Sequence, residues 1–540
     1  MKIELRISRF DPEKDRAPYY RTYTIDAEKH TTVLDALIHI KDCEDDTLTF
    51  RRSCRSGICG SCAVRVNHRA CLACKTRAMD SIYEGCILVE PLKNLRIIRD
   101  LVVDLDPFFR TIEQVSPWIT RDCTAAERRM YPADVRELNK TGDCIMCGAC
   151  YSDCNVLDVD RKFLGPAGLV KCYRFVVDPR DNLASERIKQ AIELGIFKCP
   201  VDQECELACP AHIGIRRDVI ESLRHHGAKY GIAPMPAHRR LIQSVLDTGG
   251  VVPVKTEPAI ERHQHRERSF NGITEVYFKD FDGEPENDIV LFLGCIINRR
   301  QQESADAIIN ILQHNRIAVH LPKRQTCCGS PFMRSGMYEN MRPFVSQNID
   351  IFNSYAEHGV RCILTSCSGC NSTFRHDYPG LAVDYGLAVN YRIFDTGEYM
   401  YHLLRSGKLN EDFREIRMST MYHYPCHIRA SGLEEGIYVD LIERIPGLVL
   451  KQVPSSGLCC GGGGGVRAAY PELADKLAIR RMNIAQEEGV DSLFTNCPFC
   501  ILSFERGIKL REDAGEALHF KIYDFYRVFS EAYGGTGAGP

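Results

Sequence analysis

Hydrophobic residues at the start of the chain alternate with charged ones and then take a helical spacing. Ile3, Leu5 and Ile7 are separated by single charged residues, and residues 20–25 alternate less regularly. Both stretches predict paired β-strands. Residues 32–37 are predicted to form a capped helix, with Thr31 or Thr32 at its N-cap. The first hundred residues therefore predict a small domain of strands and helix.

The pattern becomes helical after about residue 100. One helix is predicted between a cap at Asn182 and a stop at Gly195. Its apolar face consists of Ala184, Ile188, Ala191 and Ile192.

From residue 288 onward, short buried strands alternate with helical stretches such as the one whose apolar face is Ala305, Ile308, Ile309 and Leu312. The predicted strands are residues 288–293, 317–321 and 362–365, and then residues 421–424, 448–453 and 492–495. The chain is therefore expected to be a multidomain α+β and α/β protein, since 540 residues exceed what one core holds.

Charge and hydropathy narrow the classes of function. Lys and Arg number 69 against 72 Asp and Glu, which argues against a nucleic-acid or membrane-surface binder. The longest apolar run, residues 289–297, is about half of the roughly 20 residues that a membrane-spanning helix needs. No apolar signal segment follows Met1, so a cytoplasmic protein is expected. There, 27 cysteines are expected to be metal ligands and not disulfides.

The first cysteine group follows the predicted N-terminal strands. A C-x4-C-x2-C run with a distant fourth cysteine is the plant-type spacing for a [2Fe–2S] cluster. Glycines in this run would let the loop wrap the cluster with its N–H groups aimed at sulfur. The predicted ligands are Cys54, Cys59, Cys62 and Cys74, with Cys71 as a bystander.

Two further groups lie in the helical region. In two-cluster ferredoxins three close cysteines bind one cluster and the fourth crosses to the other. That rule assigns one [4Fe–4S] cluster to Cys144, Cys147, Cys150 and Cys209. It leaves Cys154, Cys199 and Cys205 for a second cluster.

The last half contains the same motif twice, C…CCG…CxxC, which indicates an internal duplication. Its members are Cys295, Cys327, Cys328, Cys367 and Cys370 in the first copy, and Cys426, Cys459, Cys460, Cys497 and Cys500 in the second. They follow the carboxyl ends of predicted strands, where open α/β sheets place their sites, so the two cysteine loops are expected to face a shared centre. Five ligands with adjacent thiolates favour an unusual cluster with accessible iron. One zinc ion or a plain cube with a spare thiol is the alternative, and a vicinal disulfide is disfavoured in a reducing compartment.

Residues 53–62, 72–74, 87–104 and 162–167 resemble the iron–sulfur subunit of succinate dehydrogenases and fumarate reductases. The resemblance implies a β-grasp ferredoxin fold followed by a helical two-cluster domain. In that family the second cluster is [3Fe–4S], whereas Asp202 stands here in the middle of the last C-x5-C. Asp202 is a candidate ligand of a fourth iron, and the alternative is a solvated loop acid.

The duplicated motif resembles the catalytic subunit of heterodisulfide reductases of methane-forming archaea, where each copy holds a non-cubane [4Fe–4S] cluster. The fusion resembles the iron–sulfur subunit of thiol:fumarate reductases. This implies oxidation of the coenzyme M and coenzyme B thiols to their heterodisulfide, with electrons passed to an FAD flavoprotein subunit that reduces fumarate. The alternatives are a quinone-linked succinate dehydrogenase subunit whose duplicated half docks a membrane anchor, and a pure electron relay. Residues 461–465 are glycines without the spacing of a dinucleotide-binding fingerprint.

Together these motifs predict six segments. They are a [2Fe–2S] domain at residues 1–98, a helical two-cluster domain at 99–232, a linker at 233–287, the two cysteine-rich repeats at 288–405 and 406–530, and a flexible tail at 531–540. The linker contains Pro234, Pro236, Pro253 and Pro258 among its prolines and a charged run, which favours a solvated connector over a metal site at His238, His263 and His265.

Some residues near the duplicated motif are weaker candidates. His423 and His427 flank Cys426 and are candidate proton acceptors or coenzyme contacts, although structural packing is the commoner role for such a histidine. Arg429 and Arg467 are candidate contacts for the anionic ends of the coenzymes. No role is predicted for the remaining cysteines, Cys43, Cys71, Cys86, Cys123, Cys172 and Cys362.

Overall fold

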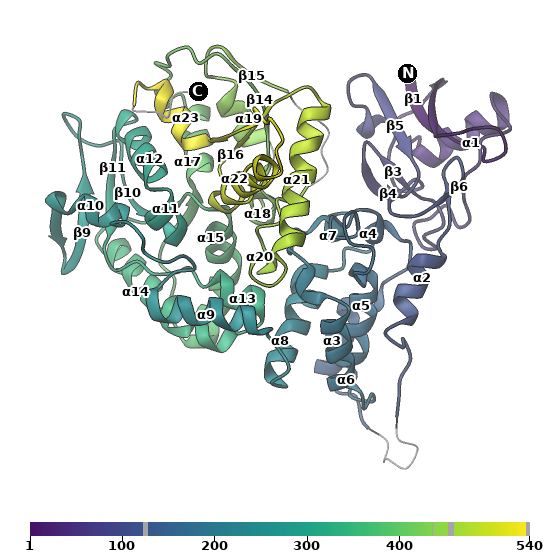
Figure 1. The fold of residues 1–540 in the computed structure, drawn as a ribbon, viewed down its shortest axis with the longest axis horizontal. Helices are drawn as coiled ribbons and strands as arrows, with labels where there is room; N and C mark the ends of the chain where they lie inside the picture. Colours follow the sequence, from purple (N-terminus) through teal and green to yellow (C-terminus); the bar gives the residue numbers. More distant parts are fainter. Residues whose placement is uncertain (122–127, 435, 452–457, 536–540) are drawn as a thin grey trace. The chain divides into compact units, whose positions relative to one another are not determined.

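A computed structural model describes residues 1–121, 128–434, 436–451 and 458–535 (Figure 1). These residues form two compact units, which meet in the sequence at Ala233 and Pro234. No helix among the described residues is both long enough and apolar enough to cross a membrane.

The first unit opens with a five-stranded sheet in the order β2-β1-β5-β3-β4, with helix α1 beside it, which confirms the β-grasp expectation. Its elements are β1 (Lys2–Arg9), β2 (Tyr19–Asp26), α1 (Val33–Cys43), β3 (Ala63–Val66), β4 (Arg69–Leu72) and β5 (Cys86–Glu90). Ile3, Leu5 and Ile7 of β1 are buried, as their alternation predicts. Thr32 caps α1 and forms a capping box with Asp35.

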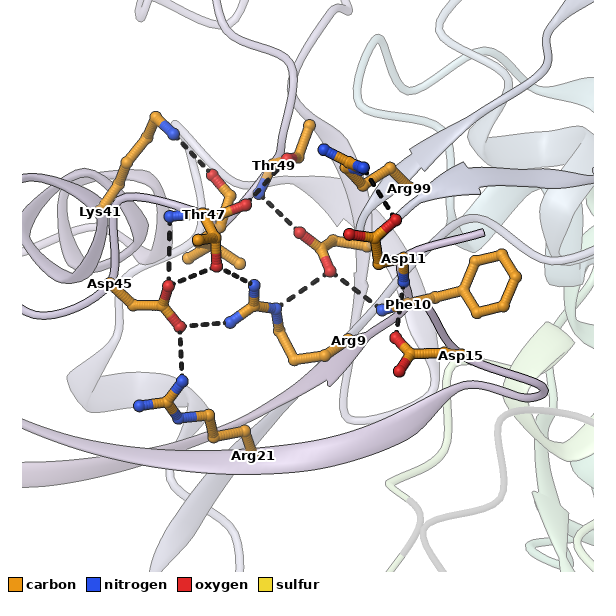
Figure 2. Close-up of polar contacts among 12 residues, drawn as sticks. Arg9, Phe10, Asp11, Asp15, Arg21, Lys41, Asp45, Thr47, Thr49 and Arg99 are labelled. Atoms are coloured by element: carbon orange, nitrogen blue, oxygen red, sulfur yellow. Dashed lines mark hydrogen bonds and ion pairs between the residues drawn. The ribbon is translucent and has the colours of Figure 1, made fainter. Parts of the chain in front are cut away.

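A buried arginine ties strand β1 to the segment that leads into the first cysteine loop (Figure 2). The Nε atom of Arg9 donates to Asp100 over 3.0 Å, and its guanidinium also bonds Asp45 and Thr47 over 2.5 and 2.8 Å. Asp100 in turn accepts a bond of 2.8 Å from the backbone N–H of Thr49. Residues 45–49 are therefore fixed to the sheet a few positions before Cys54.

The rest of the first unit is mainly helical. After the small sheet of β6 (Ile97–Arg99) and β7 (Val102–Val103), the helices are α2 (Asp106–Glu113), α3 (Pro132–Gly142), α4 (Ala149–Ser152), α5 (Gly165–Val176), α6 (Ala184–Glu193), α7 (Glu204–Leu207), the π-helix at Ile215–Glu221 and α8 (Ser222–Lys229). The helix predicted after Asn182 is α6. Its N-cap is Leu183, which makes no side-chain cap bond, so the predicted cap at Asn182 is wrong by one residue. Gly195 follows the helix with a φ of 95°, as a stop requires.

The second unit contains two sheets with matching topology. The four parallel strands of the first follow the order β13-β12-β10-β11, and those of the second follow β17-β16-β14-β15. In chain order the strands are β10 (Asn287–Phe292), β11 (Ile317–Pro322), β12 (Cys362–Thr365), β13 (Arg392–Asp395), β14 (Met418–Tyr422), β15 (Leu448–Leu450), β16 (Ser492–Thr495) and β17 (Lys521–Asp524). The predicted strand at residues 448–453 ends beyond β15, partly outside the described residues.

Each repeat covers its sheet with helices and also packs helices against the other repeat. The helices are α11 (Gly294–Arg300), α12 (Gln302–His314), α13 (Ser330–Ser335), α14 (Arg342–Glu357), α15 (Ser368–Ser372), α16 (Tyr378–Tyr385), α17 (Thr396–Arg405), α18 (Cys426–Ala430), α19 (Gly436–Ile442), α20 (Val466–Ala469), α21 (Pro471–Glu487), α22 (Pro498–Asp513) and α23 (Phe525–Ala532). Helix α17 packs against α19, and α23 packs against α12. Helix α15 contacts α18, and α22 contacts α11. The last helix of each repeat thus lies on the other repeat, and one apolar core runs through both.

Part of the stretch expected as a linker folds with the first repeat. It holds α9 (Pro236–Thr248), α10 (Ala259–Arg262), β8 (Glu267–Phe270) and β9 (Ile273–Phe278). Strand β9 pairs antiparallel with β11, so the hairpin extends the first sheet to six strands. His238 is buried with Nε2 3.0 Å from the carbonyl oxygen of Gly465, and His263 contacts Asp306 over 2.9 Å.

Candidate iron–sulfur centres

The [2Fe–2S] loop directs backbone N–H groups at its cysteine sulfurs. The N–H of Gly57 donates to Cys74 over 3.2 Å, and the N–H groups of Ile58 and Cys59 donate to Cys54 over 3.4 and 3.3 Å. Gly57 has a φ of 73°, a conformation in which a side chain is strained. The loop therefore offers sulfurs with the N–H contacts that a cluster of this kind uses.

This loop touches the loop of the next cysteine group. A Cβ atom placed on Gly60 would lie 2.8 Å from the Cβ atom of Cys147. Because Gly60 stands between Cys59 and Cys62, only a glycine lets the two loops approach so closely. Centres held by the two loops would therefore be neighbours.

The cysteines assigned to the first four-iron cluster line a single cavity. Its wall also includes Phe108, Ala167 and Val170, and its four cysteines are Cys144, Cys147, Cys150 and Cys209. Burial raises the pKa of Cys147 to about 11 and that of Cys150 well above its usual value. Buried thiols converging on one apolar cavity fit a cluster, because iron holds such thiols as thiolates.

The three cysteines left for the second cluster lie close to Asp202. Burial raises the pKa values of Cys154, Cys199 and Cys205, and the Asp202 charge raises them further. Asp202 is only 7% exposed and accepts a 2.9 Å bond from the side-chain amide of Asn155. The alternative of a solvated loop acid is therefore wrong, whereas ligation of iron by Asp202 stays a prediction.

The first cysteine-rich repeat brings its five cysteines into one chain of sulfur contacts. Each thiol interacts with the next, in the order Cys295, Cys327, Cys328, Cys370, Cys367. They follow β10, β11 and β12, so the prediction of sites past the carboxyl ends of strands is correct. A Cβ atom on Gly294 would lie 3.3 Å from the Cys370 sulfur, so the backbone also crowds this centre.

The second repeat forms the same chain through Cys459, Cys460, Cys500 and Cys497. The sulfur of its remaining cysteine, Cys426, lies 3.3 Å from Nδ1 of His427. Backbone N–H groups of Gly461 and Gly462 donate to the sulfurs of Cys459 and Cys460 over 3.3 and 3.4 Å. The glycine run therefore supplies backbone N–H donors to both adjacent cysteines.

The two centres touch each other. The side chain of Ser368, next to Cys367, lies near the Cys497 thiol of the other repeat and helps to lower its pKa. The Gln301 amide donates to the carbonyl oxygen of Pro498 over 3.1 Å. Phe499 packs against the apolar clusters that contain both sets of cysteines. The expectation that the two loops face a shared centre agrees with these contacts.

Of the residues predicted as proton acceptors or coenzyme contacts, only some lie at a cysteine centre. His423 is buried against the second centre, where one of its ring nitrogens and the sulfurs of Cys460 and Cys500 lie within 4.8 Å of one another. The Arg467 guanidinium forms an ion pair with the Asp475 carboxylate over 3.0 Å, and the Arg429 guanidinium lies over the ring of Tyr424.

Of the cysteines without a predicted role, Cys172 is buried and donates to a backbone carbonyl, and Cys71, Cys86 and Cys362 lie on strands. Cys43 is exposed, and Cys123 lies outside the described residues. Sequence reasoning missed Arg481, a buried residue of α21 behind His423. A position-by-position comparison of the two repeats could have identified this arginine.

Two family models match the chain. A 2Fe-2S iron-sulfur cluster binding domain matches residues 4–110, and a cysteine-rich (CCG) domain matches residues 289–375 and 420–505. A crystal structure of a hypothetical protein from Helicobacter pylori has a similar fold, with a TM-score of 0.61, 11% identity and coverage of 99% of this chain and 95% of that one.

Curated relatives extend these matches. A fumarate reductase (CoM/CoB) subunit of Methanothermobacter marburgensis is 29% identical over 98% of this chain and 99% of its own. An uncharacterised iron–sulfur protein of Methanococcus maripaludis is 30% identical over 87% of this chain and 88% of its own. The fumarate reductase iron–sulfur subunit of Mycobacterium tuberculosis is 39% identical over 39% of this chain and 86% of its own. The chain therefore belongs to the iron–sulfur subunits of fumarate reductases, in a form that carries a duplicated cysteine-rich CCG domain.

Proposed function

We propose that this subunit oxidises the thiols of coenzyme M and coenzyme B to their heterodisulfide and passes the electrons to a flavoprotein that reduces fumarate. Two thiols give one disulfide, two protons and two electrons, and fumarate takes up both electrons and both protons to become succinate. The observation that carries the proposal is the contact between two complete five-cysteine motifs, through the hydrogen bond from Gln301 to Pro498 and the packing of Phe499.

The accessible side of each centre is its first cysteine. Cys295 and Cys426 are half-buried, while the other eight cysteines of the duplicated motif are buried. Iron bound there would supply a site for a thiolate sulfur and an acceptor for its electron. The short helices that begin each motif, α11 and α18, each contact the CxxC helix of the other repeat. Two thiols that approach Cys295 and Cys426 would therefore meet between the two centres.

The first unit supplies the path for electrons. The proposed ligands are those predicted from the sequence, with one [2Fe–2S] cluster, two cubane-type clusters and two non-cubane [4Fe–4S] clusters. The loop proposed to hold the [2Fe–2S] cluster is exposed at Cys59 and at Ile58, whose exposed fraction is 69%. We assign this face to the flavoprotein partner, the FAD subunit that would reduce fumarate.

Separate electron donors test the proposal. The subunit is purified anaerobically with its flavoprotein, and fumarate reduction is driven either by both coenzymes or by a reduced viologen dye. Cys328→Ser and Cys460→Ser are expected to lower the thiol-driven rate at least about tenfold and to leave the dye-driven rate close to wild type. Cys362→Ser, on strand β12, is the control and is expected to change neither rate. An unchanged thiol-driven rate in both variants would place the thiol chemistry elsewhere.

A further inference from the structure

The two cysteine-rich centres differ at one position beside them. Three residues before the first cysteine of each motif stands Phe292 in the first repeat and His423 in the second. Phe292 packs edge-on against Phe374, with ring centroids 4.8 Å apart at an angle of 87°. His423 packs against Phe504 with a centroid distance of 4.8 Å and an angle of 87°. The imidazole therefore occupies the place that a phenyl ring occupies in the other repeat.

His423 contacts the sulfurs of its centre. One ring nitrogen and the sulfurs of Cys460 and Cys500 lie within 4.8 Å of one another, and all three residues are buried. The His423 ring nitrogen lies beside the Cys460 thiol, and the two groups interact. A phenyl ring has no hydrogen-bonding atom, so Phe292 offers no such bond to the first centre.

Arg481 determines which ring nitrogen carries the proton. Its Nε atom donates to Nδ1 of His423 over 3.4 Å. A guanidinium only donates, so Nδ1 accepts and the neutral ring carries its proton on Nε2. That N–H is the donor the ring has for a Cys460 thiolate. Metal ligation through Nε2 would need the proton on Nδ1, where it would face the N–H of Arg481.

The arginine belongs to the second repeat alone. Arg481 stands sixteen residues before the first cysteine of the CxxC, and Ile351 stands at the same distance in the first repeat. Arg481 is 2% exposed, and its Nη1 atom has no hydrogen-bond partner among the residues that the structure describes. Burial lowers the pKa of Arg481 to about 10. A buried cation of this kind needs an anion nearby, and a thiolate at Cys460 would provide one.

We propose that His423, held by Arg481, is a positioning residue that donates a hydrogen bond to the Cys460 sulfur. As a result, the cluster of the second repeat is easier to reduce than that of the first. Hydrogen bonds and positive charge near cluster sulfurs favour the more negative, reduced state. This rests on the part of the proposed function that puts a cluster in each repeat, and it holds whether or not thiols are the substrates.

Redox titration of the full chain, purified anaerobically and followed by electron paramagnetic resonance, tests this without coenzymes or fumarate. His423→Phe copies the first repeat. It is expected to lower the midpoint potential of one cysteine-rich centre towards that of the other, with iron per chain unchanged. Arg481→Ile, which copies Ile351, is expected to shift the same potential in the same direction. Phe292→Leu is the packing control and is expected to leave that potential in place.

An unchanged potential in His423→Phe would overturn the proposal. Loss of iron from one centre would also overturn it, because it would make His423 a ligand. His423→Gln keeps an N–H donor and is expected to retain most of the wild-type potential, so it serves if the phenylalanine variant folds poorly. A shift in His423→Gln as large as that in His423→Phe would show that the donor is irrelevant. Because no thiol is present, these results are separate from failure of the thiol assay.

Discussion

The duplicated motif provides a matched pair of glycine substitutions with different expected effects. Gly329 and Gly461 each follow the adjacent cysteines, with φ values of 86° and 74°. An alanine at either position is strained by about 1–2 kcal/mol, because side chains disfavour the left-handed region. What the new methyl group meets differs between the two.

At Gly461 the methyl group would lie 2.5 Å from the backbone oxygen of Ala474 and 2.8 Å from its Cα. These atoms belong to helix α21 and cannot move aside without shifting the helix. At Gly329 the nearest atom is the terminal methyl of Met341, at 2.7 Å, and this side chain can change rotamer. Overpacking against fixed atoms costs roughly 1–3 kcal/mol more, so Gly461→Ala is expected to be the more damaging by about that amount.

Iron per chain and the melting temperature of the anaerobic protein measure the difference. Gly461→Ala is expected to lose most of the iron of one centre, about four atoms if the cluster is [4Fe–4S], and to melt below Gly329→Ala. Gly329→Ala is expected to keep its iron and lose a few degrees. Equal losses in the two variants would refute the steric reasoning, and so would a greater loss in Gly329→Ala.

Three other substitutions test separate parts of the structure. Asp202→Ala is expected to lower iron per chain by about one atom and to alter the cluster spectrum if the carboxylate is a ligand; unchanged spectra would remove Asp202 from the ligand set. Burial raises the pKa of Asp395 to about 7, so its native state holds a proton that the unfolded chain releases above about pH 4. Stability is therefore lost as pH rises from about 4 to 7, by up to about 4 kcal/mol, and Asp395→Asn should show a smaller fall in melting temperature over that range; an equal fall would contradict the assignment. Arg9→Met leaves the buried Asp45 without its closest cation and is expected to destabilise the N-terminal domain by roughly 3–5 kcal/mol, and a near-wild-type melting curve would count against the network in Figure 2.

The grouping of the cysteines and the positions of the strands could be predicted from the sequence, because both depend on the spacing of residues close together in the chain. The alternation at Ile3, Leu5 and Ile7 and the buried runs before Cys295 and Cys426 each form the expected strand. The cap of α6 is Leu183 and not Asn182, because this helix begins without a side-chain cap that sequence could identify.

What the sequence did not predict depends on tertiary contacts. The hairpin of β8 and β9 lies in a stretch of charged residues and prolines that favours a loop locally. It forms because β9 pairs with β11 and buries Glu275 against His320 over 2.9 Å. The packing of α23 on α12 and the contact of Arg481 with His423 join residues distant in the chain, which periodicity cannot reveal.

The central claim is that thiols are oxidised at the duplicated cysteine motif and that their electrons reach fumarate. It is tested most directly by counting free thiols lost and succinate formed by the anaerobic subunit with its flavoprotein and both coenzymes. We expect two thiols to be lost for each succinate formed, and no reaction when either coenzyme is omitted. Succinate formed without thiol loss, or no coupled reaction with both coenzymes present, would contradict it.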